Sequence, residues 1–330
     1  MGGSGIGDEF ELIAKYFAPL AKDAPGALGL TDDAAIVDLP PDEQLVVALD
    51  ALVAGVHFLA NDPPGDIARK IVRVNLSDLA AMGARPVGLL LSLVLPQDVT
   101  LDWLQEFAQG LKSDVEKFAV PLIGGDTVSS PGPLTLSLTA LGAVPTAGAL
   151  TRAGARPGDG IYVTGTIGDG VLGLEVAQGG LKDLPPAHRD ALLARYRKPE
   201  PRIEFGLRLV DFGHAAIDVS DGLLADLEHI CACSGVGASI TAGKVPVSPA
   251  AKGVLQLDSG RLADFLIGGD DYELLFTASP EREAEIHAIG MELGLGVTLI
   301  GVITEGGGLE VTDAEALDLS FKRLGFKHFQ

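Results

Sequence analysis

The sequence predicts a protein of mixed α/β layers. Apolar residues repeat at helical spacing in some stretches and alternate at strand spacing in others, and the two kinds of stretch follow one another along the chain. The 330 residues include 43 Gly and 20 Pro but only 5% aromatic residues, so turns are frequent. Frequent turns favour a fold of many short helices and strands over a helical bundle.

The helical pattern is clearest over residues 101–118, where an apolar stripe with steps of three and four follows a candidate N-cap at Thr100. The strand pattern is clearest over residues 134–139, where Leu and Thr or Ser alternate. Further strands are expected, in chain order, at residues 45–49, 88–95, 120–123, 161–164, 215–219, 273–277 and 297–302. Further helices are expected between them at residues 10–17, 66–82, 169–178, 189–195, 203–212, 223–231 and 281–293.

A turn-rich and weakly periodic stretch at residues 144–159 marks the best domain boundary. We therefore predict two domains, residues 1–150 and residues 151–330. With 47% apolar residues in the chain, each can bury a core. The tripeptide at residues 124–126 recurs at residues 268–270, which suggests related halves.

The charge of the chain excludes several classes of partner. The chain has 24 Lys and Arg and 45 Asp and Glu, which gives a net charge of −21. Direct binding to nucleic acid or to an anionic membrane is therefore disfavoured. No apolar run approaches the roughly 18 residues that span a bilayer, and residues 1–6 lack the features of a signal peptide. The two cysteines, Cys231 and Cys233, cannot form a disulfide framework. We expect a cytoplasmic protein.

Familiar nucleotide motifs are absent from the sequence, but aspartates recur at the ends of predicted strands beside glycines. Carboxylates in such places can converge on one crevice, and hard divalent cations neutralise them. Asp78 lies in the middle of an apolar helix, an unusual place unless it faces the same cations. Spacing alone predicts an Mg²⁺-dependent site suited to phosphate chemistry. The alternative is that each Asp caps a helix or closes an Asx-turn. The residues concerned are Asp32, Asp33, Asp50, Asp126, Asp218, Asp221, Asp270 and Asp271.

Longer motifs resemble the thiamine-monophosphate kinase family, a branch of the aminoimidazole-ribonucleotide-synthetase-like superfamily. They occupy, in order, residues 50–58, 74–84, 122–127, 150–154, 157–165, 217–223 and 268–274. The resemblance implies a two-domain α/β fold whose N-terminal domain dimerises through its sheet and binds ATP and Mg²⁺, with a C-terminal domain that completes the site. It also implies transfer of the ATP γ-phosphoryl group to thiamine monophosphate, with several Mg²⁺ ions.

The resemblance also implies roles for single residues. Asp33, Asp50, Asp78, Asp126, Asp218 and Asp221 would bind Mg²⁺, and Asp33, Asp78 and Asp126 would be the central residues for catalysis. Gly125, Asp126, Arg152 and Ser220 would contact the nucleotide, while His57, Asp270 and Phe326 would contact thiamine monophosphate. Two features depart from the family pattern: Thr31 replaces a glycine, and Ala48-Leu49 replaces the hydroxyl residues that commonly assist metal binding.

The implied chemistry needs no general base, because a phosphate monoester is largely a dianion at neutral pH and is already a nucleophile. Positioning and charge neutralisation then dominate catalysis. Two alternatives stay open: another ATP-using synthetase of the superfamily, and a non-catalytic acidic metal-binding protein. A selenophosphate synthetase is disfavoured because no Cys precedes Cys231. His57 and Phe326 could also be ordinary packed residues.

Overall fold

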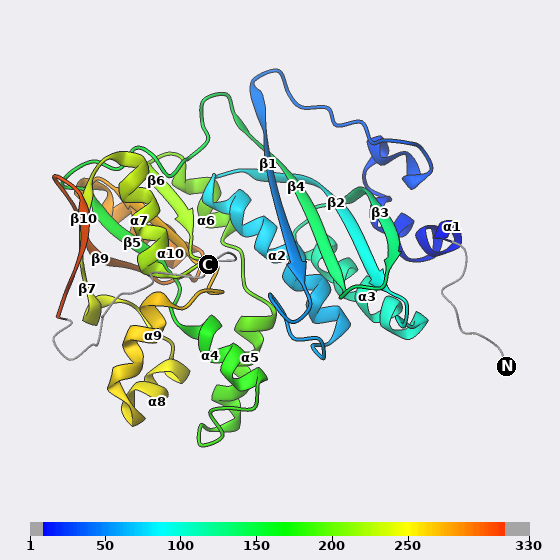
Figure 1. Cartoon of the computed structure of the whole chain (residues 1–330). Coiled ribbons are helices and arrows are strands. Elements are labelled where there is room, and N and C mark those ends of the chain that lie inside the picture. Colours follow the sequence, from blue (N-terminus) through cyan, green and yellow to red (C-terminus); the bar gives the residue numbers. More distant parts are fainter. Residues whose placement is uncertain (1–8, 314–330) are drawn as a thin grey trace. The chain divides into compact units, whose positions relative to one another are not determined.

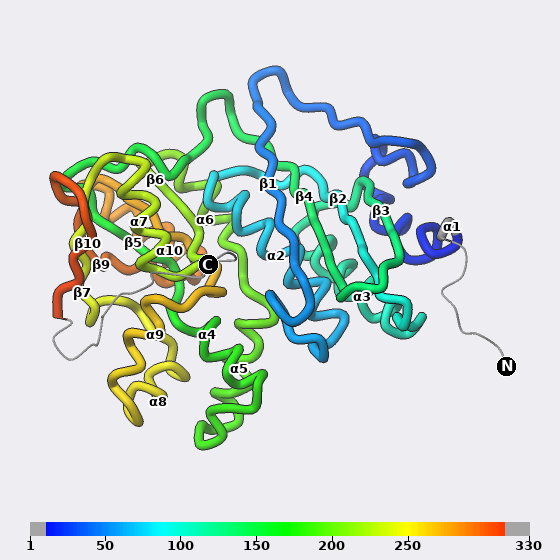
Figure 2. Tube along the Cα trace, in the orientation of Figure 1, coloured from blue at the N-terminus to red at the C-terminus, as the bar shows by residue number. Residues whose placement is uncertain are grey.

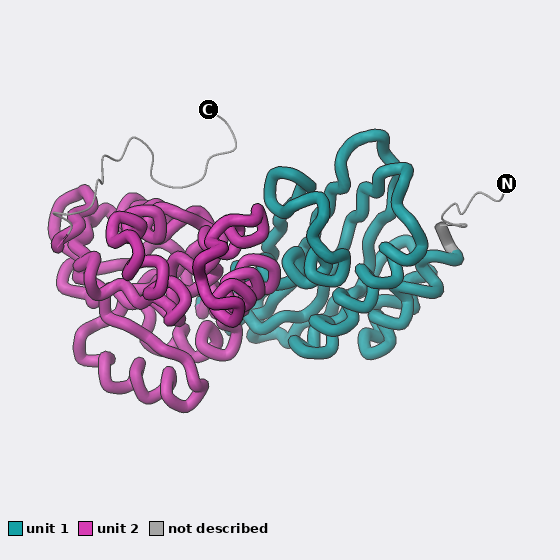
Figure 3. Tube along the Cα trace, turned by 90° about the horizontal axis from the view of Figure 1, so that it is seen from below, with its two compact units in different colours: residues 1–79, 84–147 teal, residues 80–83, 148–330 magenta. Residues whose placement is uncertain are grey.

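The computed structural model describes residues 9–313, and these form two compact units of helices and sheets (Figure 1). The first unit falls within residues 1–79 and 84–147, and the second within residues 80–83 and 148–330 (Figure 3). The mixed α/β class predicted from the sequence is confirmed in both. Among residues 9–313, no helix has both the length and the apolar character needed to cross a membrane.

The first unit contains one four-stranded sheet in the described part of the chain, with the order β1-β4-β2-β3. Its strands are β1 (Glu43–Val53), β2 (Arg85–Pro96), β3 (Leu122–Ser130) and β4 (Thr135–Pro145). Strand β4 is antiparallel to both neighbours, whereas β2 and β3 are parallel. Figure 2 traces the chain through this order, with β1 and β3 as the two edges.

Helices α2 (Pro64–Ala81) and α3 (Leu101–Lys117) supply the helical layer of this unit. Helix α3 connects the parallel strands β2 and β3, as a parallel crossover requires. It begins where the sequence predicts, because the Thr100 hydroxyl accepts a hydrogen bond from the Trp103 N–H at 3.2 Å.

The register gives this sheet two unlike faces. One face is buried: Leu91 pairs with Leu138 across the sheet, and their exposed fractions are 3% and 0%. Toward this face, a Cβ built on Gly142 of β4 would lie 3.0 Å from the Leu79 side chain of α2. We call the other side of the sheet the open face. On β1 it carries Leu45, Val47 and Leu49, which are 47%, 55% and 62% exposed.

A segment of short helices precedes the sheet in sequence and packs on part of the open face. It comprises α1 (Glu9–Leu12), η1 (Ile13–Phe17), η2 (Ala18–Ala21) and η3 (Pro25–Leu30). Ala21 and Ala27 of this segment form an apolar cluster with Ile123 and Leu141 of the sheet. The helix predicted over residues 10–17 is therefore split between α1 and a π-helical turn.

The second unit contains a six-stranded sheet with the order β10-β7-β9-β5-β8-β6 among the described residues. Its strands are β5 (Gly160–Thr164), β6 (Gly213–Asp218), β7 (Gly237–Thr241), β8 (Leu274–Ala278), β9 (Val297–Thr304) and β10 (Gly308–Thr312). Its helices are α4 (Asp169–Ala177), α5 (Pro186–Arg197), α6 (Ile203–Leu209), α7 (Leu223–Ser234), α8 (Pro249–Leu257), α9 (Leu262–Ile267) and α10 (Glu283–Glu292), with the short turns η4 (Ala242–Lys244), η5 (Ser259–Arg261) and η6 (Pro280–Arg282).

Helix α7 and the sheet share the main core of the second unit, in which Leu227, Ile217 and Ile300 are at most 3% exposed. On the sheet, the Tyr162 and Phe276 rings stack with centroids 5.3 Å apart. A smaller core unites α4, α5 and α8 around Phe265. These cores hold the ends of β6 and β8, where the second unit places its aspartates.

Several strands are longer than the sequence predicts, and in two of them this changes the position of an aspartate. Strand β1 continues to Val53 and β3 continues to Ser130, so Asp50 and Asp126 lie inside strands and not at their ends. The reason is the neighbouring strand: Asp50 pairs with Leu138 of β4, and Asp126 pairs with Ser92 of β2.

Candidate functional site

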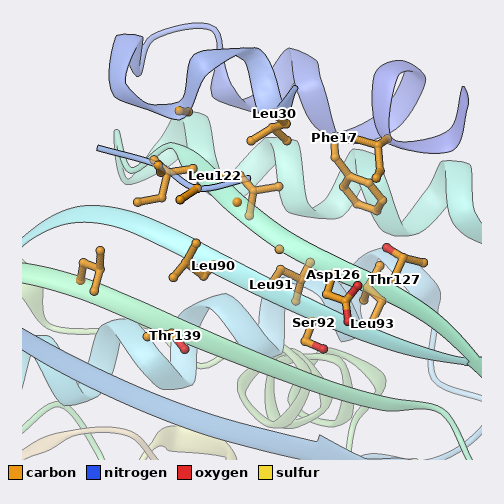
Figure 4. A pocket seen from close by; sticks show the side chains of 18 of the residues that line it. Phe17, Leu30, Leu90, Leu91, Ser92, Leu93, Leu122, Asp126, Thr127 and Thr139 are labelled. Carbon is orange, nitrogen blue, oxygen red and sulfur yellow. The ribbon is translucent and has the colours of Figure 1, made fainter. Parts of the chain in front are cut away.

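A cavity of about 660 Å³ lies between the N-terminal segment and the open face in the first unit (Figure 4). Phe17 and Leu30 of the segment line one side of it, and Leu90 of β2 lines the other. At one end, Figure 4 shows the Asp126 carboxylate beside Ser92. The cavity is therefore apolar along most of its wall and acidic at that end.

Asp32, Asp33 and Asp126 all line this cavity. Among residues 9–313, those that line it include no Lys or Arg. Several carboxylates without a basic partner favour the binding of a cation. Gly125 precedes Asp126 where β3 runs against β2, and a Cβ there would lie 2.1 Å from the Leu91 carbonyl oxygen. This predicted nucleotide contact is thus a glycine for a steric reason.

Asp50 lies on the buried face of the same sheet, opposite to the face that carries Asp126. Its N–H donates a hydrogen bond to Asn75 Oδ1 of α2 at 3.1 Å, and the Asn75 amide group donates to the Ile71 carbonyl oxygen at 2.9 Å. Asp78 follows Asn75 by about one turn of the same helix. Asn75, which is fully buried, therefore couples the backbone at Asp50 to the helix that carries Asp78.

His57 is half-buried in the loop after β1. Its Nδ1 accepts a hydrogen bond from the Val53 N–H at 3.0 Å. Because Nδ1 accepts, the ring proton is on Nε2, and that atom is a hydrogen-bond donor. This arrangement is suited to an anionic group such as a phosphate.

In the second unit, Asp218 and Asp221 flank the end of β6, and both raise the pKa of Asp226. Burial raises the pKa of Asp226 most, and the two neighbouring carboxylates add to that effect, which brings it to about 8. Asp226 Oδ2 accepts hydrogen bonds from the N–H groups of Ser220, Asp221 and Gly222 at 3.1, 3.1 and 3.2 Å. A buried aspartate thus organises the loop that contains two of the predicted site residues, Ser220 and Asp221.

Asp270 lies in the loop before β8, where two non-glycine residues have left-handed backbone conformations. The φ angles of Asp270 and Tyr272 are 71° and 52°, and the Tyr272 hydroxyl donates to Asp270 Oδ1 at 3.2 Å. Between them, Asp271 is 1% exposed and accepts N–H hydrogen bonds from Gly168 at 2.8 Å and Gly170 at 2.9 Å. Such strain persists only where surrounding structure enforces it.

Glu273 fixes the other end of this loop. Its carboxylate is fully buried and accepts hydrogen bonds from Arg195, Arg202 and the Thr164 hydroxyl. Arg195 also donates to the Asp271 carbonyl oxygen at 3.0 Å. The ion pair with Glu273 raises the pKa of Arg202, although burial opposes that effect.

The exposed Arg152 lies in the loop after residue 150, and its carbonyl oxygen accepts a hydrogen bond from the Ser234 hydroxyl at 3.2 Å. Ser234 Oγ also accepts from the N–H groups of Gly154 and Ala155 at 3.1 Å each. The backbone of the Arg152 loop is therefore fixed, while its side chain is free to reach a ligand. The predicted substrate residue Phe326 lies outside the described residues.

The structure thus brings the predicted site residues together only in part. Asp33 and Asp126 line the same cavity. The backbone of Asp50 is linked through Asn75 to the helix that carries Asp78. Asp218 and Asp221 are both close enough to Asp226 to raise its pKa. Among residues 9–313, no group of three His, Cys, Asp or Glu side chains could hold a metal ion by itself. Four buried residues lie around these sites: Asn75, Asp226, Asp271 and Glu273. The sequence interpretation counted Asp271 among the aspartates at strand ends and assigned no role to the other three. All four lie inside or beside the family motifs.

The buried Asp271 makes the stability of the chain depend on pH. Burial raises its pKa to about 8, although two N–H hydrogen bonds oppose the effect, whereas in the unfolded chain it ionises near 3.9. Between these values the folded state holds a proton that the unfolded state has lost, so stability falls as pH rises, by at most about 1.4 kcal/mol per pH unit. Asp271→Asn cannot titrate. We therefore expect the free-energy difference between wild type and this variant to shrink from pH 5 to pH 8 in urea denaturation; a constant difference would contradict the assignment.

Comparisons with known proteins agree with this architecture. The family model "AIR synthase related protein, N-terminal domain" matches residues 31–144, and the corresponding C-terminal model matches residues 156–314. The thiamine-monophosphate kinase of Escherichia coli K12 is 42% identical over 97% of this chain and 98% of its own length.

Solved structures show the same likeness. The thiamine-monophosphate kinase of Stenotrophomonas maltophilia K279a is 44% identical, has a TM-score of 0.80 and aligns over 86% of this chain and 89% of its own. A complex of AaThiL with AMPPCP and TMP is 33% identical, has a TM-score of 0.78 and aligns over 90% of this chain and 91% of its own.

Proposed function

Because this chain belongs to the thiamine-monophosphate kinase family of AIR synthase related proteins, we propose that it transfers the γ-phosphoryl group of ATP to thiamine monophosphate. The products are thiamine diphosphate and ADP. The observation that carries the proposal is the likeness, over about nine-tenths of both chains, to AaThiL in complex with AMPPCP and TMP. The motifs at residues 50–58, 217–223 and 268–274 lie at the sites described above.

The reaction brings a phosphate dianion against the polyphosphate of ATP, so the chain must orient two anions and reduce their repulsion. His57 Nε2 is the donor proposed for the acceptor phosphate, since its Nδ1 is already occupied by Val53. Arg152 and Ser220 are proposed to contact the nucleotide. Asp270 is proposed to accept a hydrogen bond from the amino group of the pyrimidine, and Phe326 to stack on one of the substrate rings. No side chain needs to remove a proton from the nucleophile.

The carboxylates fit Mg²⁺ by their chemistry, because they are oxygen ligands and those in the cavity have no basic partner among its described lining residues. We propose that Asp33, Asp50, Asp78 and Asp126 of the first unit are Mg²⁺ ligands, and that Asp218 and Asp221 of the second unit are Mg²⁺ ligands as well. Bound Mg²⁺ would neutralise the charge that develops on the transferred phosphoryl group. Ala48 and Leu49 offer no hydroxyl oxygen, so one metal position would be either lost or completed by water.

We also propose that two copies of the chain form a homodimer through the open face of the first unit. Leu45, Val47 and Leu49 lie on alternate positions of β1 and are each about half exposed. An apolar row on a strand is costly to leave in water and is typical of an interface. We also propose the cytoplasm as the location of the enzyme, because Cys231 and Cys233 are free thiols.

A coupled ADP-release assay at saturating Mg²⁺ tests the proposed function. We expect ADP release that depends on thiamine monophosphate and the formation of one thiamine diphosphate per ADP. Thiamine and aminoimidazole-ribonucleotide precursors serve as control acceptors. ADP release with thiamine but not with its monophosphate would overturn the proposal, and ATP binding without turnover on any acceptor would favour a non-catalytic role.

A further inference from the structure

We propose that Asp226 and Asp271 are separate positioning residues, one for the nucleotide and one for the acceptor. Asp226 holds residues 220–222, here called the nucleotide loop, and Asp271 holds residues 268–273, here called the acceptor loop. The inference rests on the proposed function, because the names of the loops come from the roles proposed for Ser220 and Asp270.

The nucleotide loop is organised by a single oxygen atom. Asp226 lies in the first turn of α7, is 2% exposed, and accepts three consecutive N–H groups on Oδ2. Three consecutive amides thus converge on one acceptor, which holds the backbone of residues 220–222. Gly222 completes the loop with a φ of 128°, and a Cβ there would lie 2.5 Å from the Ile267 carbonyl oxygen.

The acceptor loop is fixed by the start of α4. The two oxygens of Asp271 accept the N–H groups of Gly168 and Gly170, so the carboxylate caps this helix from outside its own sequence. The helix lies so close to the loop that a Cβ on Gly170 would be 2.5 Å from the Asp270 carbonyl carbon. Asp270 and Tyr272, which have left-handed conformations, lie on either side of the cap.

Backbone hydrogen bonds set the spacing between the two loops. The Asp270 N–H donates to the Ser220 carbonyl oxygen at 2.9 Å, and the Tyr272 N–H donates to the Val219 carbonyl oxygen at 2.8 Å. A Cβ on Gly269 would lie 2.2 Å from the Ser220 carbonyl oxygen, so only glycine allows this approach. Each loop thus has its own buried aspartate as an anchor.

The chain offers a matched control in Asp169. This residue is 3% exposed and lies at the same helix start as the Asp271 cap. Its carboxylate accepts hydrogen bonds from the hydroxyls of Thr166 at 2.7 Å and Ser248 at 2.6 Å, both outside the two loops. Asp169→Asn therefore removes a buried carboxylate of the same kind without releasing either loop.

The test compares Asp226→Asn, Asp271→Asn and Asp169→Asn by steady-state kinetics, thermal unfolding and calorimetric titration with a non-hydrolysable ATP analogue and with thiamine monophosphate. For Asp271→Asn we expect the KM for thiamine monophosphate to rise about tenfold while the KM for ATP stays within about twofold. For Asp226→Asn we expect the KM for ATP to rise about tenfold while the KM for thiamine monophosphate stays within about twofold. Asp169→Asn should change stability but neither KM.

Equal rises in both KM values, or KM values that match those of Asp169→Asn, would overturn the inference. If Asp271→Asn fails to fold, Gly170→Ala displaces the acceptor loop from the side of α4 and should raise only the KM for thiamine monophosphate. Asp226→Ala leaves no oxygen to accept the three N–H groups, so it is the second variant for the nucleotide loop and should raise only the KM for ATP. A wild-type chain that neither binds nor phosphorylates thiamine monophosphate would refute the proposed function instead. In that case the affinity of Asp226→Asn for the ATP analogue, compared with Asp169→Asn, still decides the role of Asp226.

Discussion

Replacing Asp126 by asparagine is expected to lower kcat at least about a thousandfold while leaving the fold intact. Asparagine keeps the size of the side chain but removes the charge with which the cavity would hold a cation against the phosphates of both substrates. Asp126 is exposed on the edge strand β3, so its loss should change the free energy of unfolding by no more than about 0.5 kcal/mol. ADP-release kinetics and thermal unfolding measure the two quantities.

Asp32→Asn is the matched control for this experiment. Asp32 lines the same cavity and neighbours Asp33, but no metal role is proposed for it; its carboxylate accepts the Asp33 N–H at 2.9 Å. We expect its kcat to stay within about tenfold of wild type. An Asp126→Asn enzyme that is as active as Asp32→Asn would contradict the metal assignment, whereas equal and severe losses would show that the total charge of the cavity matters more than one ligand.

The sequence predicts most elements of the fold because their patterns are local. The stripe over residues 101–118 and the Thr100 cap correspond to α3, and the alternation over residues 134–139 lies mostly within β4. Helix α8 (Pro249–Leu257) is missed although Ser248 and Pro249 are typical of a helix start. Two other missed elements have weak local signals. Strand β7 (Gly237–Thr241) has five mostly small residues, and its place is set by pairing with β9 and β10. Helix α9 (Leu262–Ile267) has only six residues, too few for a helical period to show.

The candidate site is less predictable because it depends on which face of a sheet a residue occupies. The sequence shows Asp50 and Asp126 beside apolar runs. The strands that contain them end only where their pairing with a neighbouring strand ends, and these pairs are β1 with β4 and β3 with β2. That ladder places the two carboxylates on opposite faces and on strands at opposite edges of the sheet. No pattern within either segment contains this information.

The same limit applies to the residues that support the site. Asp226 and Asp271 follow proposed ligands by five and one positions, so their chemistry was visible in the sequence. Their partners were not, because the N–H groups that Asp271 accepts lie about a hundred residues earlier, at Gly168 and Gly170. Only the approach of α4 to the acceptor loop identifies this aspartate as a cap.

The largest effect on stability is expected from Arg73→Met in the first unit. Asp114 of α3 is fully buried, and its carboxylate accepts two hydrogen bonds from the Arg73 guanidinium, at 2.6 Å from Nε and 2.9 Å from Nη2. The Phe118 ring lies 5.4 Å from the same guanidinium. Removing the arginine leaves a buried carboxylate without its cation, which costs about 3–5 kcal/mol.

Trp103 provides the measurement, because it is the single tryptophan of the chain and lies on α3, stacked on Phe107. Its fluorescence during urea denaturation reports on the unit that contains the ion pair.

Arg69→Met is the control, since Arg69 forms a partly exposed ion pair with Asp66 at 3.3 Å, and its loss should lower the free energy of unfolding by less than about 1 kcal/mol. The double variant Arg73→Met, Asp114→Leu removes both charges and should recover most of the loss. If Arg73→Met cost no more than Arg69→Met, the buried pair would not stabilise the packing of α2 on α3.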